Sequence, residues 1–308
     1  MRLDWTTAPL GRAAQLDCPL LYALLAAARR AQGSLRKMIS PAQARRATTK
    51  VPRVTVYFWI IKILTTALGE ATSDYLVHRF NPYYAVIGGF FAFLIAMAIQ
   101  FRVRKYIPWA YWLAVVMVAV FGTMAADVLH VEFGVAYIAS TILFAIALGV
   151  VFTTWHRSER TLSIHSIYTR KREAFYWAAV LATFAMGTAT GDLAAYTAKL
   201  GFLTAGVLFS AVFAIPAVAY RFFRLNAIFA FWFAYIMTRP LGASFADWTG
   251  KSRHAGGLSY GDGPVAFVLA IFIVALVSYL SHTGADRETA TSQEWRGPGE
   301  TAVEEASG

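Results

Sequence analysis

The chain has 308 residues, 58% of them hydrophobic, and its mean hydropathy is +0.51. A soluble protein could not keep so much apolar sequence from water, so the composition predicts an all-α integral membrane protein. The net charge of +11 would also suit nucleic-acid binding. However, the basic residues lie in short segments between apolar runs, so we expect no nucleic-acid partner. The single cysteine, Cys18, excludes a disulfide framework and a thiolate metal cluster.

The first 49 residues form a basic segment that lacks the pattern of the rest of the chain. Its apolar stretch, 16–28, is too short for the ~20 residues that a spanning helix needs. One interpretation is a partly disordered cytoplasmic extension that contacts anionic lipid. The other is that translation starts at Met38 and the preceding residues do not belong to the protein.

Eight apolar spans follow, each close to the length of a helix that crosses a bilayer. They are residues 54–76, 83–101, 109–128, 135–155, 174–193, 201–220, 227–246 and 264–281. The odd-numbered spans share a frame in which Trp precedes Asp by fifteen residues and Gly precedes Asp by five. We therefore expect eight transmembrane helices arranged as four parallel two-helix repeats. The repeats are about 50–108, 109–173, 174–225 and 226–281.

Most Lys and Arg residues fall in segments on one side of this topology, which places both termini in the cytoplasm. The polar tail 282–308 is predicted to be a disordered cytoplasmic segment.

The four tryptophans of the frame are interpreted as anchors at the membrane interface. They are Trp59, Trp112, Trp177 and Trp232. The four glycines are expected to let helix backbones approach one another closely. They are Gly69, Gly122, Gly187 and Gly242.

Each span of the frame ends with an aspartate, and a carboxylate inside a membrane is costly unless it is paired, hydrated or bound to a cation. These residues are Asp74, Asp127, Asp192 and Asp247. We expect their side chains to meet in one layer that binds a cation or a proton. The alternative is that each one marks the water boundary or caps a turn.

The first span carries a polar stripe at intervals of four residues: Lys62, Thr66, Glu70 and Asp74. Glu70 has no acidic counterpart in the other repeats and is a candidate ligand. Lys62 has two interpretations, either snorkelling to the cytoplasmic interface or pairing with an acid across the bundle. Arg239, which precedes Pro240, is a candidate counter-ion for Glu70 or Asp74.

Hydroxyl groups near the same layer either ligate a cation or bond back to their own helices. They belong to Thr65, Thr66, Thr72, Ser73, Thr183, Thr188 and Thr190.

Weaker signals include Gly250-Lys251-Ser252, which lacks the glycine that a phosphate-binding loop needs five residues before its lysine. His254 and Asp262 of the same outer loop have two interpretations, a weak contact to a metal or, as we favour, solvated positions. No histidine pair has metal-ligand spacing, so tightly held zinc is not expected.

With these repeats aligned, the chain resembles a family of bacterial inner-membrane proteins that carry four tandem copies of a repeat of unknown function. The resemblance rests on KVPRVTVYFWIIKILTTALGEATSDYL at 50–76 and on the later frames at Trp112, Trp177 and Trp232. It implies a multi-pass protein of the bacterial inner membrane, and it covers residues 50–281.

The function expected from these residues is secondary transport, as an exporter of a cation or a small cationic solute. Oxygen ligands would suit a hard ion such as Mg²⁺ or Mn²⁺, or protons. The alternative is a non-transporting scaffold or sensor in which the frame only packs the bundle. Nothing in the sequence joins a nucleophile to an acid–base pair or a cofactor motif, so neither an enzyme nor a cofactor is expected. The lipid bilayer is the one partner implied directly, and the oligomeric state stays open.

Overall fold

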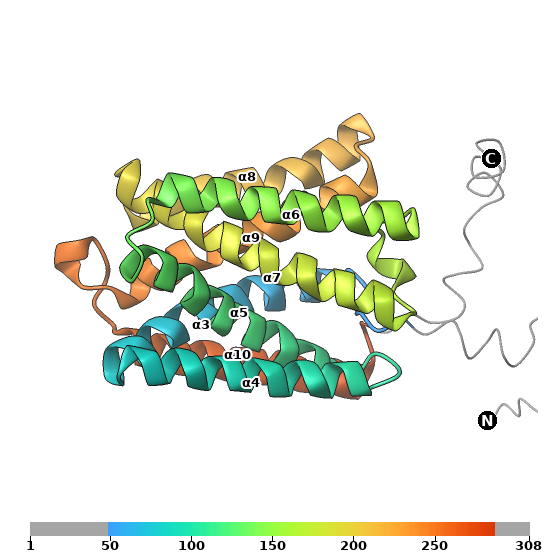
Figure 1. Cartoon of the computed structure of the whole chain (residues 1–308), viewed down its shortest axis with the longest axis horizontal. Coiled ribbons are helices and arrows are strands. Elements are labelled where there is room, and N and C mark those ends of the chain that lie inside the picture. The colour runs from blue at the N-terminus through green and yellow to red at the C-terminus, as the bar shows by residue number, and fades with distance from the viewer. Residues whose placement is uncertain (1–48, 287–308) are drawn as a thin grey trace, which may run out of the picture. The chain divides into compact units, whose positions relative to one another are not determined.

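The computed structural model describes residues 49–286, which contain eight α-helices, three short helical turns and no strand. Figure 1 shows the eight helices running alongside one another. Their bounds are α3 Val56–Arg79, α4 Pro82–Arg102, α5 Pro108–Val131, α6 Tyr137–Glu159, α7 Arg170–Asp192, α8 Phe202–Phe223, α9 Ala227–Gly250 and α10 Asp262–Thr283. One helix lies at each predicted span, so the all-helical fold class is confirmed for these residues. The expectations for residues 1–48 and for 287–308 lie outside the described residues.

Six of the eight helices are long and apolar enough to cross a membrane. The other two, α3 and α9, carry charged side chains that lower their hydropathy, among them Lys62, Glu70 and Arg239. These three side chains are buried, between 0 and 6% exposed. The charges therefore lie between helices and not on the outside of the bundle.

The described helices form an inner ring and an outer layer. In the ring, α3 contacts α5 and α9, and α7 also contacts α5 and α9. Outside it, α4 packs mainly on α5, α6 on α7, α8 on α9 and α10 on α3. Large apolar side chains of the outer helices face away from the protein, such as Phe91 at 58%, Ile146 at 60% and Phe267 at 68% exposed. Such a surface is unfavourable in water and matches lipid.

Local signals explain where the helices begin. The Thr55, Asn81, Thr169 and Asn226 side chains accept hydrogen bonds from the free N–H groups of the first turns of α3, α4, α7 and α9. Pro82 and Pro108 occupy the first positions of α4 and α5, where a missing N–H costs nothing.

Each frame glycine lies against the next helix of the ring, and the four contacts close a circle. A Cβ atom at Gly69 would lie 2.5 Å from the Ala119 Cβ atom, and one at Gly122 would lie 3.1 Å from the Phe184 Cβ atom. One at Gly187 would lie 2.6 Å from the Arg239 Cβ atom. In each of these three contacts, the residue on the neighbouring helix lies seven positions after the tryptophan of its own repeat. The fourth contact, Gly242 with Thr66, joins the last ring helix to the first.

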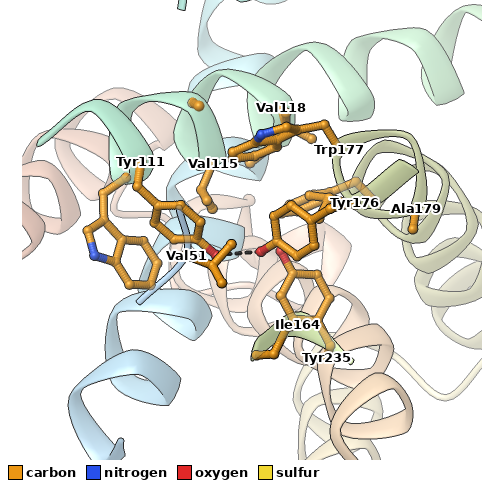
Figure 2. Packing of buried hydrophobic residues seen from close by; sticks show 14 of the residues in the cluster. Val51, Tyr111, Val115, Val118, Ile164, Tyr176, Trp177, Ala179 and Tyr235 are labelled. Carbon is orange, nitrogen blue, oxygen red and sulfur yellow. Dashed lines mark hydrogen bonds between the residues drawn. The ribbon is translucent and has the colours of Figure 1, made fainter. Parts of the chain in front are cut away.

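Aromatic side chains fill the ring at the tryptophan end of the repeats. Figure 2 shows the Tyr111 and Tyr176 hydroxyls hydrogen bonded to each other, 2.5 Å apart, with the Tyr235 ring beside them. These three side chains are at most 1% exposed. The interior of the ring is therefore closed at this end.

The frame tryptophans belong to the same packed region. Trp112, Trp177 and Trp232 are between 2 and 4% exposed, and Trp59 is partly buried. The Trp232 indole N–H donates to the Leu162 carbonyl at 3.0 Å. A side chain enclosed in this way contacts neighbouring helices and not the outer surface, where an interface anchor would lie.

Candidate functional site

The centre of the site is a buried ion pair between the first and last ring helices. Arg239 of α9 pairs with Glu70 of α3, and its Nη2 atom also donates to the Thr123 hydroxyl of α5 at 2.5 Å. Arg239 is 1% exposed and Glu70 is 6% exposed. Glu70 is one of the two acids expected as partners of Arg239. The pair joins three ring helices through charge-assisted hydrogen bonds.

Three carboxylates converge beside this pair. One oxygen each from Glu70, Asp74 and Asp247 can be chosen so that all three lie within 4.8 Å of one another. Asp247 is 6% exposed and Asp74 is partly buried. Three acids this close repel one another unless a cation or a proton lies between them.

The other two frame aspartates do not belong to this close group. Asp127 and Asp192 are partly buried and interact electrostatically with Glu70. Neither side chain forms a hydrogen bond or an ion pair with any residue in 49–286. The acids thus gather on the side of α3 and α9, where Arg239 and Lys251 also lie.

Lys251 brings a positive charge to the same group. It directly follows α9, and its ammonium forms an ion pair with Asp74. The Nζ atom also lies 3.8 Å from Asp262 Oδ2 and 4.0 Å from Asp247 Oδ1. Partial burial alone would lower the pKa of Lys251, but the carboxylates of Asp74 and Asp247 outweigh it and raise that pKa above its ordinary value.

The sequence favoured a solvated loop position for Asp262 over a weak metal contact and predicted no role in the site for Lys251, whereas the structure places both residues beside the carboxylates. The Lys251 ammonium pairs with Asp74 and lies 3.8 Å from Asp262 Oδ2, because the chain turns back between α9 and α10. One signal could have indicated Lys251: it stands four residues after Asp247, the spacing of an ion pair on a helix. His254 is exposed, as expected.

Lys62 is enclosed by aromatic rings. Its side chain is 0% exposed, and its Nζ atom lies 4.1 Å from the centre of the Phe184 ring and 4.3 Å from that of Tyr235. The ammonium has no hydrogen-bond partner among the described residues. Both interpretations of Lys62 were therefore wrong: it neither snorkels to an interface nor pairs with an acid. Aromatic side chains surround the ammonium, and the buried Glu70 carboxylate is paired with Arg239.

We expect Lys62→Met to raise the free energy of unfolding by about 1–3 kcal/mol, because a buried ammonium without an acceptor costs more than cation–π contacts return. Thermal unfolding of the purified protein in detergent would measure the change. Lys105→Met, at an exposed position, should stay within about 0.5 kcal/mol of the wild type. A loss of stability in Lys62→Met would show that the rings stabilise the charge.

The hydroxyl groups bond mainly to their own helices. The Thr65, Thr183, Thr188 and Thr190 side chains donate to carbonyls three or four residues earlier. Thr66 also donates to the Thr238 carbonyl of the neighbouring helix α9 at 2.9 Å. The buried Ser73 hydroxyl has no partner within 49–286. Of the two interpretations of these hydroxyls, back-bonding describes the four threonines.

The fold and these residues define a helical protein of the multi-pass membrane type, built from tandem repeats around buried charges. Four segments of the chain, 57–106, 110–161, 175–226 and 230–285, match the family model described as Repeat of Unknown Function (DUF347). The chain belongs to this family, which confirms the resemblance to a family with four tandem repeats. No curated protein and no solved structure matched the chain.

Proposed function

We propose that the protein is a secondary transporter, acting as an exporter, for a cation or a small cationic solute, and that it is not an enzyme. The observation that carries this proposal is the convergence of Glu70, Asp74 and Asp247 inside a helical ring. Carboxylates enclosed among membrane helices are costly, and such residues mark ion pathways and proton relays.

In this proposal all eight helices cross a bacterial inner membrane as four parallel repeats around an axis along the membrane normal. The circle of glycine contacts supports the arrangement, since helices related by rotation repeat the same contact at the same register. The charges of α3 and α9 would then face the ring, and both helices would cross the membrane as α5 and α7 do. Both termini would lie in the cytoplasm, in agreement with the distribution of Lys and Arg.

The carboxylates would bind the cation, and protons would replace it in another step of the cycle. Oxygen ligands favour a hard ion such as Mg²⁺ or Mn²⁺ or an ammonium group. Arg239 would neutralise one negative charge, so that an empty site does not hold three uncompensated acids. The aromatic cluster of Tyr111, Tyr176 and Tyr235 would close the path at the cytoplasmic end.

We expect Asp247→Asn to reduce Mn²⁺ binding and cation efflux at least about tenfold, because it removes one charge from the ligand set. Asparagine has the same shape, and Oδ1 of Asp247 makes no hydrogen bond within the described residues, so the fold should survive. Binding would be measured by electron paramagnetic resonance on purified protein, and efflux in a deletion strain. Glu132→Gln, an exposed acid at the end of α5, is the matched control.

Wild-type binding and efflux in Asp247→Asn and in Asp74→Asn would overturn the proposal. The scaffold or sensor alternative predicts that outcome, together with lower thermal stability. Growth of the deletion strain across a panel of metal salts and toxic amines would identify the cargo.

A further inference from the structure

The carboxylate group has an occupant supplied by the chain itself. Lys251 reaches acids from three helices: Asp74 of α3, Asp247 of α9 and Asp262 at the start of α10. Its side chain is 20% exposed, so most of the side chain lies within the protein. Two of these acids, Asp74 and Asp247, also belong to the close group with Glu70.

The contact with Asp247 is incomplete. Its Oδ1 atom is buried and has no hydrogen-bond partner among the described residues. The Lys251 Nζ atom, at 4.0 Å, is beyond hydrogen-bonding distance of it. A buried acceptor without a donor is costly, and it points to a ligand that approaches more closely than the lysine does.

The backbone that carries Lys251 is held firmly at the end of α9. The N–H groups of Leu258, Tyr260 and Gly261 donate to carbonyls of Trp248, Thr249 and Gly250 at 2.7, 3.1 and 3.1 Å. The Ser259 N–H donates to the Lys251 carbonyl at 2.9 Å. The flexible four-carbon stem can therefore leave the acids by rotation while the loop stays in place.

We propose that Lys251 is a tethered ammonium that occupies the cation site and that the cargo must displace. This inference rests on the proposed function, and it makes Lys251 a residue that sets selectivity. An arriving cation must outcompete a positive charge that is already paired with Asp74, which disfavours ions that bind carboxylates weakly. Singly charged cations that are strongly hydrated are the first class to be excluded.

The charges of the site give the direction of the effect. Glu70, Asp74, Asp247 and Asp262 face Arg239 and Lys251, so the acids outnumber the bases. Removing the Lys251 charge leaves the acids less compensated and should strengthen the binding of an added cation.

The test is Mn²⁺ binding to the purified full-length protein, measured by electron paramagnetic resonance. We expect Lys251→Met to bind Mn²⁺ at least about tenfold more tightly than the wild type. Lys251→Gln keeps a donor for Asp74 and serves as a second neutral variant with the same expected tightening. Lys251→Arg should keep wild-type affinity, as should Lys199→Met, which removes an exposed lysine of another outer loop.

A second measurement uses Lys251→Ala and added ethylammonium. Ethylammonium should compete with Mn²⁺ in this variant and much less in the wild type, because it refills the space of the missing side chain. Competition of that kind supports a tethered ammonium even if the larger variants fold poorly.

The inference and the proposed function fail in different ways. If neutral variants at Lys251 bind Mn²⁺ no more tightly than the wild type while Asp74→Asn abolishes binding, Lys251 is not an occupant and the cation site stands. If Asp74→Asn and Asp247→Asn leave Mn²⁺ binding unchanged in the Lys251→Met protein, the cation site itself is refuted.

Discussion

Replacing Arg239 with methionine should lower the free energy of unfolding by about 3–5 kcal/mol, the cost of leaving a buried charge without its partner. The change leaves the Glu70 carboxylate, 6% exposed, with no ion-pair partner among the described residues. It also removes the donor to the Thr123 hydroxyl, so contacts among α3, α5 and α9 weaken together. Chemical or thermal unfolding in detergent measures the loss.

Two further variants separate charge from shape. The double variant Glu70→Gln/Arg239→Met removes both charges and should recover most of the lost stability, since an apolar replacement of a buried pair is often neutral. Arg253→Met, at an exposed position in the loop after α9, should change stability by less than about 0.5 kcal/mol. If Arg239→Met alone is as stable as the wild type, the ion pair contributes nothing to holding the ring together.

Gly242→Ala should lower the free energy of unfolding by about 3 kcal/mol, the upper part of the usual range for overpacking. The added Cβ atom would lie 2.0 Å from the Thr66 Oγ1 atom and 2.9 Å from both the Ala67 nitrogen and the Ile63 oxygen. Two of these three atoms belong to the α3 backbone and cannot rotate away, so α3 and α9 must separate. The same unfolding measurement applies.

Gly149 provides the matched control for this glycine. It lies in the middle of α6, and a Cβ atom there meets no atom within 4 Å. Gly149→Ala should therefore be neutral or stabilising by up to about 1 kcal/mol, because alanine loses less entropy in a helix. Equal effects at the two positions would show that the close approach of α3 and α9 does not depend on Gly242.

Hydropathy located all eight helices, because each apolar run is long enough to cross a bilayer. Four of the eight also begin after a residue whose side chain caps the first turn, such as Thr55 and Asn81. The repeated frame also indicated the glycines, and the place of Arg239 within the apolar span 227–246 indicated its pairing with an acid. Such features depend on residues close together in the sequence or on a pattern repeated along it, so the spacing of residues in the sequence is enough to predict them.

The surroundings of single side chains were harder to predict. Periodicity does not distinguish a tryptophan at a lipid interface from one between helices, and Trp112 is 2% exposed. The rings around Lys62 come from α7 and α9, far from it in sequence. Lys251 was missed because the fold of the loop after α9, and not its composition, brings the ammonium to Asp74.

The circle of glycine contacts has a consequence for how the polypeptide is connected. In each repeat, the frame glycine packs against one neighbouring ring helix, and the glycine of the repeat on the other side packs against it in turn. A fragment of two repeats therefore has one glycine without a neighbouring helix and one helix without a neighbouring glycine. Two such fragments satisfy each other, and the peptide between α6 and α7 supplies none of the four contacts. Judged by the glycine contacts alone, a subunit of two repeats would fit a second such subunit and complete the circle of four contacts. Joining the two subunits in one polypeptide adds a covalent link and leaves this circle unchanged.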